Sequence, residues 1–182
     1  VSRVVRERVM AKVGEVCMMQ EKLEMRFDWN SVSERDWQEA LAHYWIHVRA
    51  ENKTLEVDMN SLELGPIARF SKEEWFYFLR DKYFRWKYTA HNRYATTTRA
   101  LEKYILEDKL DELYDIKKRL LAFDVQDIRL GLSIAKEIKG LGIAGASGLL
   151  SLMYPTAFAC VDQFVVNVLR DIPDLAEHSE IY

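Results

Sequence analysis

Glycine is concentrated in one short stretch of this chain, and that stretch holds the residue types and spacing that could bind a phosphate group. Four of the seven glycines are Gly140, Gly142, Gly145 and Gly148. Glycine is kept where the backbone needs a positive φ or must approach another group closely. The spacing also matches the dinucleotide-binding fingerprint, with Asp162 near the position of its ribose-binding acid. The glycine stretch is therefore the first candidate for a functional site.

The surrounding sequence contradicts the dinucleotide interpretation. The fingerprint must follow a buried strand, whereas residues 128–138 carry charged side chains at helical spacing and few strand-forming residues. Pro155 then leaves too little chain for the helix and second strand of a βαβ unit. We therefore expect no nucleotide cofactor.

Two other interpretations of the glycines are compatible with each other. From Gly142 onward the glycines recur every three residues, so on a helix they share one face that lets another helix approach; Gly140 is then a C-cap. Alternatively, one helix ends near Ile138, a tight turn follows, and a second helix begins at Ile143. Backbone N–H groups at such a turn and helix N-terminus can hold a phosphate whatever the base sequence.

In the second interpretation the sequence resembles the helix-hairpin-helix DNA glycosylase superfamily, whose hairpin is followed by a Gly/Pro-rich loop and an essential aspartate. The motif with both of its helices would span 128–153, and the loop with its acid 154–162. The resemblance is specific only here, in about forty residues that end near residue 170. Elsewhere it is faint: residues 85–93 look like a block found in small uncharacterised bacterial proteins that carry this hairpin.

The resemblance implies a base-excision chemistry centred on Asp162. In the family this aspartate faces a base flipped out of the duplex. It would stabilise the oxocarbenium-like charge on the deoxyribose, or orient water, as the N-glycosidic bond breaks. Bifunctional members use a lysine at the position of Ala144 to form a Schiff base, so a monofunctional glycosylase is implied. The residues alone leave open that Asp162 only caps the helix of residues 163–170.

Contacts to double-stranded DNA are expected from the hairpin and from a basic segment. Residues 80–93 hold five basic side chains and one acid, interleaved with aromatic residues, which suits phosphate neutralisation and base stacking. Aromatic residues at helical spacing are also usual in a core, and we expect Trp86 to be mostly buried. The expected DNA-binding residues are Lys139, Gly140, Gly142, Ala144, Gly145, Arg85, Lys87 and Arg93.

Composition narrows the classes of function that remain. The formal net charge of −3 means that any DNA contact must come from a local patch. Two cysteines are too few for a disulfide scaffold or a four-cysteine metal site, and no cofactor is expected apart from a monovalent cation that the hairpin could hold. A noncatalytic DNA-binding or protein-interaction module is the alternative function. We expect no membrane segment and a cytoplasmic, or in a bacterium nucleoid-associated, protein.

Two other groups of polar residues look structural. His43 and His47 are spaced as a metal pair on a helix would be, but they lack companion ligands and their aromatic neighbours suggest packing. The acids between Glu107 and Asp115 resemble a solvated helical surface, followed by the basic residues 117–119. We therefore expect no metal site.

Helical spacing predicts the elements that must position these residues, and it predicts an all-α fold in one domain, 1–182, with parts of about 1–68 and 69–182. Capping boxes begin helices at Ser33 and Ser71. Residues 52–66 are expected to be a connection with weak strand potential. The expected helices are 4–26, 33–48, 71–86, 92–106, 108–121, 125–138, 143–153 and 163–170.

Overall fold

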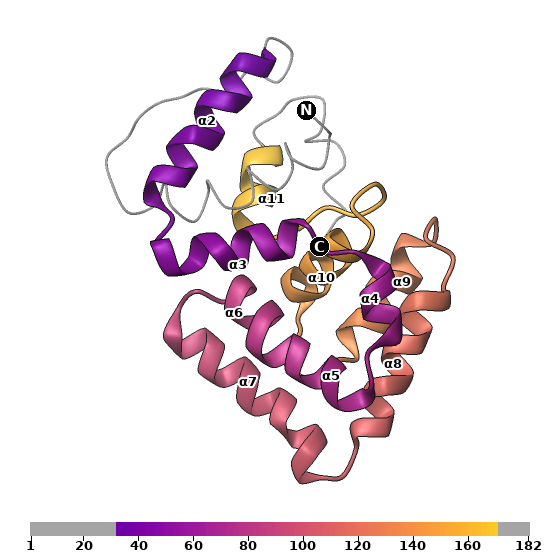
Figure 1. The fold of residues 1–182 in the computed structure, drawn as a ribbon. Coiled ribbons are helices and arrows are strands. Elements are labelled where there is room, and N and C mark those ends of the chain that lie inside the picture. The colour runs from indigo at the N-terminus through magenta and orange to yellow at the C-terminus, as the bar shows by residue number, and fades with distance from the viewer. Residues whose placement is uncertain (1–31, 171–182) are drawn as a thin grey trace. The chain divides into compact units, whose positions relative to one another are not determined.

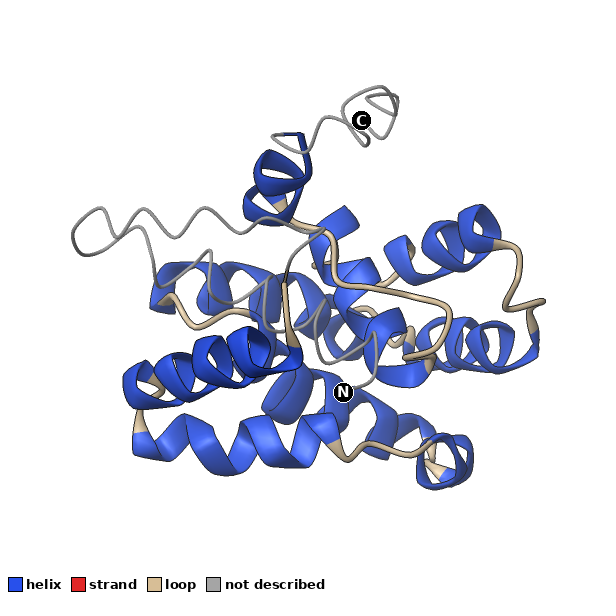
Figure 2. Cartoon of the chain, turned by 90° about the horizontal axis from the view of Figure 1, so that it is seen from above, coloured by secondary structure: helices blue, strands red, loops and turns tan. Residues whose placement is uncertain are grey.

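The computed structural model describes residues 32–170, and every regular element in this range is a helix (Figures 1 and 2). The all-α class is therefore confirmed. Within the described range, no helix combines the length and the apolar character that a bilayer span requires. The helix expected over residues 4–26 lies outside the described residues.

Contacts divide the described residues into two compact units, which are 49–160 and 32–48 together with 161–170. This division differs from the boundary near residue 68 expected from the sequence. The hairpin glycines lie in the larger unit and Asp162 in the smaller one. Each unit is therefore described by itself.

The smaller unit contains α2 (Glu34–His47) and α11 (Gln163–Arg170). The helices of the larger unit begin with α3 and end with α10, and α5, η1 and α6 follow one another without a break, with η1 in π-helical geometry. In chain order they are α3 (Ala50–Asn60), α4 (Leu64–Arg69), α5 (Lys72–Tyr77), η1 (Phe78–Tyr83), α6 (Phe84–Lys87), α7 (His91–Leu106), α8 (Leu110–Ala122), α9 (Ile128–Lys136) and α10 (Ile143–Met153).

Both expected capping boxes are confirmed. At the start of α2, the Ser33 amide donates to Asp36 Oδ2 at 2.7 Å, and the Asp36 amide donates to Ser33 Oγ at 3.3 Å. At the start of α5, the same reciprocal bonds join Ser71 and Glu74 at 2.7 and 3.1 Å. Each pair satisfies two amide groups that the helix itself cannot satisfy.

Ser71→Ala is expected to lower the free energy of unfolding by about 1 kcal/mol, because the Glu74 amide loses its acceptor. Urea denaturation measures the change. Ser133→Ala is the matched control, since Ser133 is exposed within α9 and alanine is the better helix former there. An equal loss in both variants would contradict a capping role.

The connection expected over residues 52–66 is wrong: this range contains most of α3 and the start of α4. Leu55 and Met59 lie four residues apart on α3 and both pack in the core, with Met59 fully buried. Pro66 is the third residue of α4, where its missing N–H removes no helical hydrogen bond. The proline therefore begins a helix instead of marking a loop.

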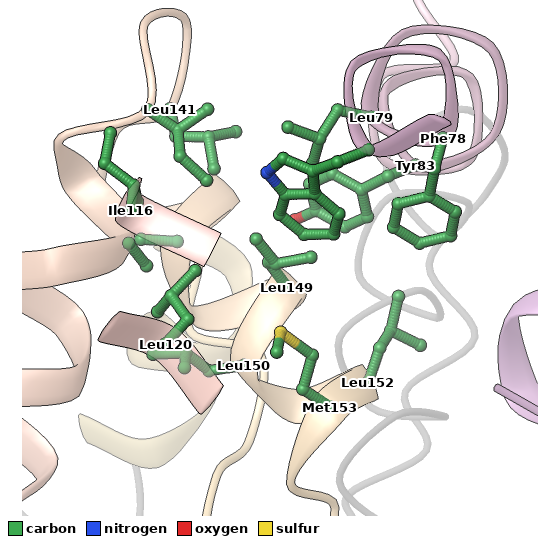
Figure 3. Packing of buried hydrophobic residues seen from close by; sticks show 14 of the residues in the cluster. Phe78, Leu79, Tyr83, Ile116, Leu120, Leu141, Leu149, Leu150, Leu152 and Met153 are labelled. Atoms are coloured by element: carbon green, nitrogen blue, oxygen red, sulfur yellow. The ribbon is translucent and has the colours of Figure 1, made fainter. Parts of the chain in front are cut away.

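The core of the larger unit is built around α10, which is buried from Gly145 to Met153. Figure 3 shows Leu149 and Met153 of α10 in one cluster with Leu120 of α8 and Leu79 of η1. Such a helix cannot move without disturbing the core. The turn that precedes α10 is therefore held at a fixed position.

Candidate nucleic-acid interface

The glycine stretch forms the turn between α9 and α10, which pack against each other. We call residues 137–142 the α9–α10 turn. Two apolar side chains anchor it in the core, Ile138 at 0% and Leu141 at 7% exposure, and the Leu141 amide donates to the Ile138 carbonyl at 3.0 Å. A helix, α9, precedes Gly140 where the dinucleotide fingerprint needs a strand, so the helix expected before the glycines is confirmed.

Gly140 has the backbone conformation that glycine alone adopts easily, with φ at +99°. A Cβ at this position would lie 2.7 Å from the Thr97 carbonyl oxygen of α7. The Tyr88 hydroxyl donates to the Gly140 carbonyl at 3.4 Å. The turn is therefore seated closely against the middle of α7.

Gly142 is different, because it is exposed and a Cβ there would meet no atom within 4 Å. It is the N-cap residue of α10, with an ordinary φ of −89°. No side chain caps α10 within the part of the chain that the structure describes. The first amide groups of a helix have no acceptor within the helix. Those at the start of α10 can therefore donate hydrogen bonds to an anion.

The packing interpretation also holds, for the two glycines farther along α10. The Tyr83 hydroxyl donates to the Gly145 carbonyl, and a Cβ at Gly148 would lie 2.9 Å from that hydroxyl and 3.3 Å from Lys87 Cδ. Burial raises the pKa of Tyr83 well above its ordinary value, with a smaller contribution from Tyr88. Gly145 and Gly148 therefore allow η1 and α6 to approach α10 closely, whereas Gly142 faces solvent.

Lys139 is held in place beside the turn. Its Nζ lies 2.9 Å from Glu107 Oε2 and 4.6 Å from the centre of the Tyr104 ring. Its amide donates to the Tyr104 hydroxyl at 3.2 Å. The hydrogen bond from Lys139 is the main cause that lowers the pKa of Glu107. A phosphate contact by Lys139 would have to compete with this ion pair.

The basic segment divides into exposed and engaged side chains. Arg85 and Arg93 are exposed and form no ion pair with any residue between 32 and 170. Lys87 is half-buried, and its Nζ lies 2.8 Å from Cys160 Sγ. Trp86 is 6% exposed, so the expectation that it is mostly buried is confirmed. Arg85 and Arg93 are thus the better placed of the three expected phosphate contacts.

Asp162 caps α11. Its Oδ1 accepts from the Phe164 amide at 3.0 Å and from the Val165 amide at 3.1 Å. The capping interpretation of this residue is therefore confirmed, and its catalytic role stays a prediction. The two bonds use one carboxylate oxygen and orient the other.

The histidines expected to pack are instead exposed. His43 and His47 contact each other on α2, with ring centroids 4.8 Å apart. Among residues 32–170, no group of three or more potential ligands is arranged to hold a metal ion. The acids of α8 are paired, for example Asp111 with Lys72 at 3.0 Å and Asp115 with Lys118 at 3.0 Å.

Two sets of polar residues were missed by sequence reasoning. Lys117, expected on a solvated surface, is 1% exposed and donates to main-chain carbonyls at the end of α4. Arg99 and Lys103 are exposed on α7, the helix whose Thr97 lies against the α9–α10 turn. The sequence feature that could have identified Arg99 and Lys103 is their spacing of four residues, because the sequence does predict the helix that carries them.

The fold and this site define an all-helical protein whose candidate interface is a buried-helix N-terminus preceded by a glycine turn. No family model, curated protein or solved structure matches the chain.

Proposed function

We propose that the protein binds double-stranded DNA through the α9–α10 turn, which acts as a helix-hairpin-helix motif. The observation that carries this proposal is the uncapped and unobstructed start of α10 at Gly142. Amide groups at such a position bind backbone phosphate without reading the base sequence. The core side chains of Ile138 and Leu141 support it, because they hold the turn in one conformation before the ligand arrives.

We further propose that the bound duplex is the substrate of a monofunctional DNA N-glycosylase reaction. Water would add to C1′ of the deoxyribose, the bond to the damaged or modified base would break, and the base would leave with the proton. Asp162 would stabilise the positive charge that develops on the sugar. Its capping bonds support this role, since they fix the carboxylate through Oδ1. Ala144 supplies no amine for a lyase step.

The second candidate function is a noncatalytic DNA-binding or protein-interaction module. The observation that favours it is the same cap, which is a sufficient structural reason for an aspartate at position 162. The two functions differ in whether a base is released, and they share the turn.

Gly142→Asp tests the binding proposal. An aspartate suits an N-cap, so thermal stability should be retained, but its charge would occupy the site and repel phosphate. Losing one charge-assisted hydrogen bond of about 1.5–3 kcal/mol corresponds to a roughly 10- to 150-fold weaker affinity. Gly142→Ala is the control and should bind within a few-fold of the parent. Fluorescence anisotropy with a labelled duplex at low salt measures both.

Asp162→Asn tests the chemistry. Asparagine caps a helix about as well as aspartate, so folding and duplex affinity should be unchanged while base release is lost. The assay incubates the protein with duplexes that carry a panel of modified bases and then reveals abasic sites by heating in alkali. Base release that survives this substitution rules out the proposed role. Salt-dependent binding without release on any substrate supports the module, and absence of binding at low salt argues for a protein partner.

A further inference from the structure

One face of α7 presents a continuous row of polar side chains to solvent. Asn92, Thr96, Arg99 and Lys103 follow one another at intervals of four, three and four residues, and all four are exposed. At 3.6 residues per turn, these intervals place them along one stripe of the helix. We call these four residues the α7 stripe.

The stripe is cationic in a chain whose net charge is negative. Arg99 and Lys103 form no ion pair with the described part of the chain, whereas on α8 Lys118 and Arg119 are paired with Asp115 and Glu137. The only carboxylate within α7 is Glu102, which is half-buried. Unpaired arginine and lysine on a stripe of small polar residues are the pattern that contacts a phosphate backbone.

The helix that carries the stripe is fixed to the α9–α10 turn. Thr97 contributes the carbonyl that lies against Gly140, and Tyr104 donates to the Glu137 carbonyl at 3.0 Å and accepts from the Lys139 amide at 3.2 Å. Thr97 and Tyr104 lie about a third of a turn around the helix from the stripe. Arg93, exposed in the first turn of α7, lies between that face and the stripe.

The stripe also has the length that a duplex contact needs. From Asn92 to Lys103 the helix rises by about 16 Å at 1.5 Å per residue. Successive phosphates of one DNA strand are about 3.4 Å apart along the duplex axis. The stripe therefore spans roughly five phosphates of one strand. A contact of this kind would extend the footprint beyond the single phosphate held at the start of α10.

We propose that the α7 stripe is a second DNA-binding surface, in which Arg99 and Lys103 neutralise backbone phosphates of the duplex that the α9–α10 turn holds. This inference rests on the proposed function of that turn. Neither side chain is buried or part of the core. The contact would therefore add affinity without base specificity.

The test replaces both cations in Arg99→Gln/Lys103→Gln and measures duplex affinity against salt concentration. The slope of log K against log salt is negative, and each lost phosphate contact reduces its magnitude by about 0.9, so the magnitude should fall by about 1.8. Lys53→Gln/Lys118→Gln is the control: both lysines are exposed on other helices, and the change in net charge is the same. The control should leave the slope close to that of the parent.

The outcomes separate this inference from the function on which it rests. If Gly142→Asp weakens binding but the stripe variant behaves like the lysine control, the stripe is not a DNA-binding surface and the turn still is. If the parent protein binds no duplex at low salt, the proposed function and this inference both fail. Binding of single-stranded RNA or of anionic lipid vesicles in preference to duplex, lost in the stripe variant, would overturn duplex DNA as the ligand.

Discussion

Gly140→Ala is expected to lower the free energy of unfolding by about 2–5 kcal/mol. The positive φ of +99° costs a residue with a Cβ about 1–2 kcal/mol. The new methyl group would also lie 2.7 Å from the Thr97 carbonyl oxygen, and forcing atoms into a packed region costs about 1–3 kcal/mol. A main-chain oxygen within a helix cannot rotate away, so the two costs add. Urea denaturation followed by circular dichroism measures the loss.

The control for this substitution lies two residues away. At Gly142 the φ is −89° and the space around the Cβ is open, so Gly142→Ala should cost about 1 kcal/mol or less, the difference between glycine and alanine as N-caps. Equal losses at both positions would mean that the α9–α10 turn does not have the described conformation. A large loss at Gly140 alone would support the turn on which the DNA-binding proposal depends.

The parts of the fold that the sequence predicts correctly depend on residues close in the chain. A capping box joins residues three apart, as Ser33 with Asp36 and Ser71 with Glu74, so both helix starts are visible without tertiary information. The polar and apolar spacing of α7, α8 and α9 repeats every three or four residues and is equally local. These elements are predicted within a few residues of their observed bounds.

The elements that escape prediction lack such local markers. Arg49 is the N-cap residue of α3, and its side chain makes no capping hydrogen bond. The same holds for Glu63, the N-cap residue of α4. The helical state of this range is stabilised instead by tertiary burial, of Met59 and of Ile67, both at most 1% exposed. Helix propensity and turn-forming residues alone therefore predict a connection in this range.

The candidate site shows the same limit. The glycine spacing predicts a turn followed by a helix, but it cannot separate the glycines that pack from the one that faces solvent. That distinction depends on Tyr83, Lys87 and Thr97, which are far from the glycines in sequence. The engagement of Lys87 with Cys160, 73 residues away, is likewise invisible to any local pattern.

A buried cation supports the packing of α4 on α8. Lys117 Nζ donates to the Ala68 carbonyl at 3.2 Å and to the Phe70 carbonyl at 2.5 Å, and it lies 4.5 Å from the centre of the Tyr114 ring. The last carbonyls of a helix have no internal donor, so this lysine satisfies the end of α4. Its four-carbon stem fills core volume at 1% exposure.

Lys117→Ala is expected to cost about 2–4 kcal/mol, because it removes both the buried stem and the donor to the carbonyls. Lys117→Met keeps the side-chain volume and removes only the ammonium group, so the loss of unfolding free energy should be smaller than in Lys117→Ala. Burial lowers the pKa of Lys117, partly offset by Glu74. The unfolded chain then binds more protons than the folded one as pH approaches the ordinary lysine value of about 10.5. The parent should therefore gain stability relative to Lys117→Met as pH rises from 7 toward 10.

Parallel urea titrations of the parent and the methionine variant at several pH values measure this difference. Tyrosines with raised pKa values, such as Tyr83, titrate in the same alkaline range and change stability with the opposite sign. Because both proteins contain them, their contribution cancels in the comparison. A difference that stays constant with pH would mean that the Lys117 ammonium is as well solvated as in the unfolded chain, which is incompatible with its burial against the end of α4.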